Sequence, residues 1–94
     1  MSEKVLQARI IKYFKENGFF VRKWHQGRYA GRGMPDIHAL KNGKAFYIEV
    51  KCPGKKPTPI QLHTMEQLKQ HGGVVFWVDS FKKFLTKISE IDSV

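Results

Sequence analysis

The sequence predicts an α/β domain whose elements follow the order α-β-β-β-α-β-α. Apolar residues recur every three or four positions near both ends of the chain, which is the spacing of a helix face. Short runs rich in β-branched and aromatic residues lie between them, and Asn42-Gly43, the strongest short hairpin signal, separates two of these runs. A chain of 94 residues suffices for one modest core, so we expect a single domain over 1–94.

An amphipathic helix is expected over 2–17, and a strand over 19–24. The apolar face of the helix consists of Leu6, Ile10 and Phe14, which recur at intervals of four. Ser2 is a suitable N-cap for this helix. The segment 26–35 contains three glycines and a proline, which predicts a loop between this strand and the next one.

A β-hairpin is expected next, with its two strands at 36–40 and 44–51. Asn42-Gly43 fits the type I′ turn between them. Side chains alternate along a strand, so Glu49 and Lys51 share one face of the second strand. Antiparallel pairing would let Asp36 on the first strand face Glu49. Two acids and a lysine on one face of a sheet can bind a hard cation and hold a water beside it.

A second helix is expected after the basic connector 53–57. Thr58 is a good N-cap, Pro59 suits the first helical position, and Gln61 would complete a capping box. The apolar side of this helix would consist of Leu62, Met65 and Leu68.

The chain then predicts one more strand and one more helix. Residues 74–78 are apolar throughout, which is typical of a strand buried on both faces. Asp79 or Ser80 would cap the last helix. Its apolar stripe would consist of Phe81, Phe84, Leu85, Ile88 and Ile91.

The charge of the chain favours a nucleic-acid partner. There are 17 Lys and Arg against 8 Asp and Glu, which gives a net charge of +9. Four basic residues flank the acidic motif in sequence and could contact phosphates, or simply be solvated: Arg28, Arg32, Lys55 and Lys56. Cys52 is the single cysteine, and no apolar run approaches the roughly 20 residues of a membrane span, so we expect a cytoplasmic protein.

Four short motifs give the sequence a family resemblance. They are Gly33-Met34-Pro35-Asp36, Glu49-Val50-Lys51, Pro59-Ile60-Gln61 and Gly72-Gly73-Val74-Val75. With the order of elements, they resemble the PD-(D/E)XK nuclease superfamily and, more narrowly, a standalone VRR-NUC (virus-type replication-repair nuclease) domain. The resemblance covers nearly the whole chain. It implies a mixed sheet flanked by helices, and metal-dependent hydrolysis of DNA, often branched DNA such as four-way junctions, by a homodimer that is sometimes virus-encoded.

The resemblance also assigns roles to individual residues. Asp36 and Glu49 would bind Mg²⁺, which Mn²⁺ could replace, together with the backbone carbonyl of Val50. Lys51 would hold the attacking water and offset charge in the transition state. Glu3, three residues before Leu6 on the buried stripe, would extend the metal site or its water shell. Gln61 would orient the lysine or the water.

Simpler interpretations stay open for these residues. Glu49 and Lys51 could form the polar face of an edge strand. Glu3 is favoured in a first helical turn by the helix dipole alone, and the capping box explains Gln61. His38 shares the face of Asp36 and could contact a substrate or simply pack in the sheet. For the whole chain, the alternatives are a non-catalytic nucleic-acid-binding module and a subunit of a larger nuclease assembly.

Overall fold

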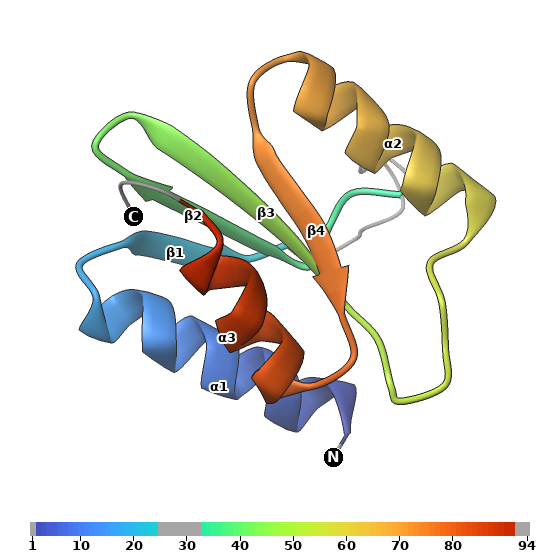
Figure 1. Cartoon of the computed structure of the whole chain (residues 1–94), viewed down its shortest axis with the longest axis horizontal. Helices are drawn as coiled ribbons and strands as arrows, with labels where there is room; N and C mark the ends of the chain where they lie inside the picture. Colours follow the sequence, from blue (N-terminus) through green and yellow to red (C-terminus); the bar gives the residue numbers. More distant parts are fainter. Residues whose placement is uncertain (1, 25–32, 92–94) are drawn as a thin grey trace.

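A mixed four-stranded sheet in the order β1-β2-β3-β4 carries helices on both faces (Figure 1). The computed structural model describes residues 2–24 and 33–91. Their elements are α1 (Glu3–Glu16), β1 (Phe20–Lys23), β2 (Ile37–Lys41), β3 (Lys44–Val50), α2 (Pro59–Gln70), β4 (Val74–Val78) and α3 (Phe81–Ser89). This order confirms the prediction. Within the described residues, the helices are all too short or too polar to cross a membrane.

The sheet combines an antiparallel and a parallel part. β1, β2 and β3 pair antiparallel, whereas β4 pairs parallel to β3. The turn between β2 and β3 holds Asn42 at φ 51° and Gly43 at φ 78°, the left-handed values that a type I′ turn requires. The predicted hairpin is therefore confirmed. Helix α2 then carries the chain back along the sheet, so that β3 and β4 end side by side (Figure 1).

The main core lies between the sheet and helices α1 and α3. It buries the predicted face of α1, namely Leu6, Ile10 and Phe14. The Phe14 ring lies 6.1 Å from that of Phe46 on β3 and 5.4 Å from that of Phe84 on α3, measured between centroids. Alternate residues of β3, from Phe46 onward, face this core. Tyr47 and Glu49 therefore face the opposite side of the sheet.

The burial predicted for the second half of the chain is partly wrong. On α2, Met65 is buried but Leu62 is 48% exposed, because the helix packs mainly against β4. On α3, Leu85 is exposed. The apolar strand 74–78 is buried on both faces, as predicted, because Val75 and Phe76 point to opposite sides and are both buried, although Val74 and Trp77 are only half-buried.

Helix α2 fixes the loop that leads into β2. Gly33 has a φ of 76°, and an added Cβ would lie 2.7 Å from the carbonyl oxygen of Ile60 and 2.8 Å from Oγ1 of Thr64. The left-handed backbone and the close approach both require glycine at this position. Helix α2 does not extend over β1 and β2, where Phe20 is 60% and Leu40 47% exposed.

Candidate active site

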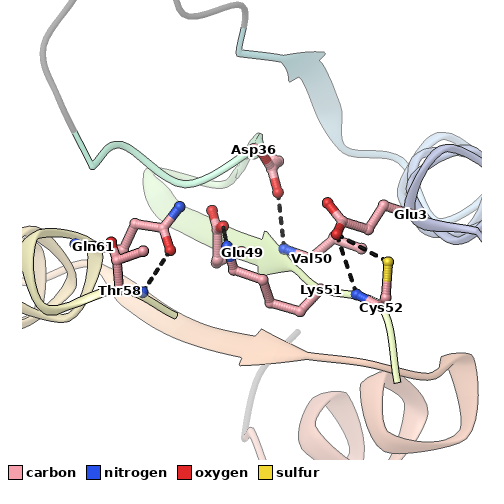
Figure 2. Close-up of polar contacts among 8 residues, drawn as sticks. All are labelled: Glu3, Asp36, Glu49, Val50, Lys51, Cys52, Thr58 and Gln61. Atoms are coloured by element: carbon pink, nitrogen blue, oxygen red, sulfur yellow. Dashed lines mark hydrogen bonds and ion pairs between the residues drawn. The ribbon is translucent and has the colours of Figure 1, made fainter. Parts of the chain in front are cut away.

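The start of β2 and the end of β3 bring Asp36 and Glu49 together (Figure 2). The ladder pairs Ile37 with Ile48, so its continuation by one step places Asp36 opposite Glu49. The Asp36 carboxylate (Oδ2) accepts a hydrogen bond of 2.9 Å from the backbone N–H of Val50. Because Val50 directly follows Glu49, this bond holds the two acids close to each other.

Glu49 is a buried acid with an incomplete set of partners. The residue is 2% exposed, and Oε2 lies 3.3 Å from the ammonium of Lys51. Its other oxygen, Oε1, is buried and has no hydrogen-bond partner in the described part of the chain. Burial and repulsion from Asp36 raise the pKa of Glu49 to about 7, although Lys51 acts in the opposite direction. The ammonium of Lys51 alone therefore does not offset the negative charge of Asp36 and Glu49 together.

Lys51 follows Glu49 by two residues and therefore lies on the same face of the sheet. Its backbone N–H donates a hydrogen bond of 2.9 Å to the carbonyl of Val78, which anchors this residue to β4 just past the end of β3. Its side chain is 15% exposed, so the ammonium is partly accessible while it contacts Glu49. A phosphate approaching the two acids would meet this cation.

Glu3 reaches the same end of the sheet from the first turn of α1, but it binds a different group. Its Oε2 accepts hydrogen bonds from the backbone N–H of Cys52 at 3.3 Å and from the Cys52 thiol at 3.1 Å (Figure 2). The bond to the carboxylate raises the pKa of the thiol. Glu3 is therefore held beside the acid pair by Cys52, a contact between residues far apart in sequence that no sequence pattern indicated.

The donors available to a metal are few. Across residues 2–24 and 33–91, no three His, Cys, Asp or Glu side chains are grouped so that they could hold a metal ion by themselves. Asp36 and Glu49 contribute two carboxylates, and further ligands would have to come from the backbone and from water. Such an all-oxygen set with retained waters suits Mg²⁺ better than Zn²⁺.

Gln61 serves as a helix cap and also points into the site. Its Oε1 accepts a hydrogen bond of 2.9 Å from the backbone N–H of Thr58, while the Thr58 hydroxyl accepts one of 3.3 Å from the N–H of Gln61. The predicted capping box is thus confirmed. Since Oε1 is the acceptor, the amide NH₂ must lie on the other side, and Figure 2 shows it turned toward Glu49. The capping role leaves a donor free for the site.

His38 packs among aromatic rings beside the acids. Its ring stacks on Trp24, with centroids 5.0 Å apart, and meets the edge of Tyr47 at the same distance. Nε2 lies 3.1 Å from the carbonyl of Pro35, to which it can donate. Burial lowers the pKa of His38 despite that bond. Alternation of side chains along a strand predicts that Tyr47 shares a face with Glu49, and His38 with Asp36. The stacking of Trp24 on His38 was not predictable in this way, because it depends on the register between β1 and β2.

Two of the four residues predicted to contact phosphates lie in the described part of the chain. Lys55 and Lys56 are exposed on the connector between β3 and α2, where the N–H of Lys55 donates to the carbonyl of Cys52 over 3.0 Å. They therefore follow the candidate site directly. Arg28 and Arg32 lie outside the described residues.

Comparison with known proteins places the chain in a family. A solved structure described as "VRR_NUC domain" superposes with a TM-score of 0.79 at 32% sequence identity, covering 93% of this chain and 94% of that one. A second, a "VRR_NUC domain protein", has a TM-score of 0.77 at 17% identity over 95% of this chain and 86% of its own length, and supports the fold alone. No protein-family model matches the sequence.

A curated relative supports the same assignment. "Putative nuclease p44" of Acyrthosiphon pisum secondary endosymbiont phage 1 is 48% identical over 50 residues, which is 52% of this chain and 54% of that protein. The match thus spans about half of the relative. Together with the full-length structural match at 32% identity, it shows that the chain belongs to the VRR-NUC domain family.

Proposed function

We propose that this domain is a metal-dependent endonuclease that hydrolyses phosphodiester bonds in DNA. One observation carries the proposal: the buried Glu49, with Oε1 lacking a partner among the described residues, lies beside both Asp36 and the Lys51 ammonium. A purely structural acid at this depth would be expected to have its hydrogen bonds satisfied. The nuclease name of the phage relative agrees with this reading.

The residues present fit a hard divalent cation. Carboxylate oxygens of Asp36 and Glu49, with the backbone carbonyl of Val50, would hold Mg²⁺, and Mn²⁺ should substitute. A cation there would relieve the repulsion between the acids and give the buried Oε1 a partner. When bound, the ion would polarise the scissile phosphate and acidify the attacking water. Glu3, held by Cys52, would act on the surrounding water shell.

The other polar residues then have separable roles. The Lys51 ammonium, kept in place by Glu49, would hold the attacking water and stabilise negative charge as it develops on the phosphate. The Gln61 NH₂ group would donate to that water or to the phosphate, since its carbonyl oxygen is engaged by Thr58. Both groups are fixed by contacts that exist before any substrate binds, which is what efficient electrostatic stabilisation requires.

The substrate and assembly belong to the same proposal. A net charge of +9 suits a polyanion, and we assign Lys55 and Lys56, with Arg28 and Arg32, to phosphate contacts. The family resemblance supports branched duplex DNA, including four-way junctions, as the substrate. A homodimer would place two sites symmetrically on such a branch. The match to a phage protein supports a virus-encoded enzyme that acts in the cytoplasm of its host.

The test is cleavage of end-labelled DNA. The panel contains single strand, plain duplex, flap and four-way junction, each with EDTA, Mg²⁺ or Mn²⁺. The wild-type protein should cut with either metal and not with EDTA. The cleavage rate should fall about 100-fold or more in Lys51→Ala. It should not change in Lys12→Ala, which replaces an exposed lysine on α1. Tight binding by the wild-type protein without cleavage would favour the non-catalytic module or the subunit of a larger assembly.

A further inference from the structure

The sheet face that carries Asp36 and Glu49 continues away from them as a mainly aromatic strip, in which Phe20 and Leu40 are exposed and Trp24, His38 and Tyr47 are half-buried. We call this surface, made of Phe20, Trp24, His38, Leu40 and Tyr47, the aromatic strip. In the described part of the chain no helix covers it, because α2 packs over β4 and α1 lies on the opposite face (Figure 1). An apolar sheet face next to a candidate catalytic centre needs an occupant.

The near end of the aromatic strip is joined directly to the candidate site. The backbone N–H of Trp24 donates to the carbonyl of Asp36 over 2.6 Å. The Trp24 and His38 rings are nearly parallel, with an interplanar angle of 16°. Tyr47 lies two residues before Glu49 on the same face of β3. The strip thus begins two residues from Asp36 along the chain, at His38, and two residues from Glu49, at Tyr47.

The far end of the aromatic strip combines exposed apolar groups with a cation. Phe20 is 60% exposed, and the guanidinium of Arg22 lies 4.3 Å from the centroid of its ring. Between the two ends lies a hollow of about 370 Å³, within the roughly 300–1,000 Å³ typical of small-ligand sites. The described residues that line it include no acid. An anionic ligand with flat, apolar groups would therefore be accepted.

We infer that the aromatic strip binds an unpaired segment of the DNA, so that the substrate class is DNA with a single-stranded stretch beside the scissile bond. Bases that are not paired can stack on aromatic rings without regard to sequence, and arginine can pair with the phosphates between them. The bases of an intact duplex are stacked on one another and cannot reach such a surface. This inference rests on the proposed function, because it uses the same face as the candidate site.

The first experiment measures binding without cleavage. Fluorescence anisotropy of a labelled oligothymidylate is recorded in EDTA for the wild-type protein and for Phe20→Ala, which alters an exposed side chain. We expect the Kd for the oligothymidylate to rise about tenfold and the Kd for plain duplex to change less than about twofold. Phe20→Tyr keeps a planar ring and should restore binding. Leu85→Ala, which truncates an exposed apolar residue on α3, should have no effect. An unchanged Kd in Phe20→Ala, or an equal loss in Leu85→Ala, overturns the inference.

Two further readouts separate this inference from its rivals. If sedimentation shows that Phe20→Ala dissociates a dimer while the oligothymidylate affinity is kept, the aromatic strip is a contact between copies and the inference is overturned. If the wild-type protein and Phe20→Ala cut flap and plain duplex in the same ratio, the inference fails and the proposed function stands. If neither cuts DNA but Phe20→Ala selectively loses oligothymidylate binding, the aromatic strip does bind unpaired DNA and it is the proposed cleavage that fails.

Discussion

The carboxylate of Asp36 accepts a hydrogen bond from the backbone N–H of Val50 across the gap between β2 and β3. This bond supports the sheet where the β2–β3 ladder ends, at the pair Ile37 and Ile48. It leaves the second oxygen of the carboxylate for another partner. Asp36 therefore has a structural task as well as the proposed metal-binding one, and substitutions can separate the two.

Asp36→Asn should keep the hydrogen bond from the Val50 N–H but lose the proposed metal binding. An amide oxygen can still accept from Val50, so the free energy of unfolding should change by less than about 1 kcal/mol. Cleavage should fall about 100-fold or more, because an uncharged ligand holds a divalent cation weakly. Asp36→Ala also leaves the Val50 N–H without its acceptor and should cost a further 1–3 kcal/mol, roughly. Urea unfolding and cleavage assays on both variants check this, and equal activity in Asp36→Asn would contradict it.

Glu49 should make the metal-free protein less stable as the pH rises. Its pKa is raised from 4.5 to about 7 in the folded state, so the folded protein holds a proton that the unfolded chain releases. The stabilisation is complete below pH 4.5 and is lost as the pH rises through about 7. At about 1.4 kcal/mol for each pH unit between these values, the loss amounts to about 3.5 kcal/mol.

Mg²⁺ should oppose this loss, because it would bind the ionised acids. Thermal unfolding in EDTA and in Mg²⁺ at pH 5 and pH 8 provides a readout that does not depend on cleavage. We expect Mg²⁺ to raise the Tm at pH 8 more than at pH 5, and Glu49→Gln to abolish the difference. A Tm that is insensitive to Mg²⁺ at both pH values would count against the metal site.

The elements were predictable where the chain carries local signals. Asn42-Gly43 sets its own turn, and Ser2, Thr58 and Ser80 cap the helices as expected. The burial of Leu62 and Leu85 was misjudged because an apolar pattern within a helix does not tell how far the neighbouring elements cover that side of it. Burial on the second face of a sheet depends on tertiary packing.

The part of the candidate site that lies on the β2–β3 hairpin was predictable from the sequence. A two-residue turn and the alternation of side chains together fix Asp36 opposite Glu49, with Lys51 on the same face. The contact of Glu3 with Cys52 joins two elements distant in sequence, and no local pattern encodes it. The stacking of Trp24 on His38 likewise depends on the β1–β2 register.

Gly33→Ala should destabilise the protein more than glycine substitution at another left-handed position. Gly33 and Gly54 have φ of 76° and 86°, so alanine is strained at both. An added Cβ at Gly54 would meet nothing within 4 Å, whereas at Gly33 it would lie 2.7 Å from the backbone of α2. We expect about 1 kcal/mol for Gly54→Ala and at least about 2 kcal/mol more for Gly33→Ala in urea unfolding. Equal losses would show that α2 does not hold this loop tightly.

Lys55 and Lys56 should contribute to DNA affinity without affecting sequence preference. Each phosphate contact adds about 0.9 to the slope of log Kd against log salt concentration for duplex DNA. The double variant Lys55→Ala/Lys56→Ala should therefore lower that slope by nearly two, roughly. Binding titrations at several salt concentrations measure it, with Lys12→Ala and Lys15→Ala on α1 combined as the control. An unchanged slope would mean that both lysines remain solvated in the complex.

Gln61→Glu should separate the role of Gln61 as a helix cap from its proposed role in the active site. A glutamate at the third helical position also completes a capping box and is favoured by the helix dipole, so stability should be kept or slightly increased. The substitution removes the NH₂ donor that points toward Glu49 and replaces it with a third negative charge. We expect kcat to fall about tenfold or more while the Tm is unchanged. Gln61→Ala should lower both, by about 1 kcal/mol in stability through the lost cap. If Gln61→Glu cleaves DNA as fast as the wild type, Gln61 is a helix cap only, because the cap is the one function the two side chains share.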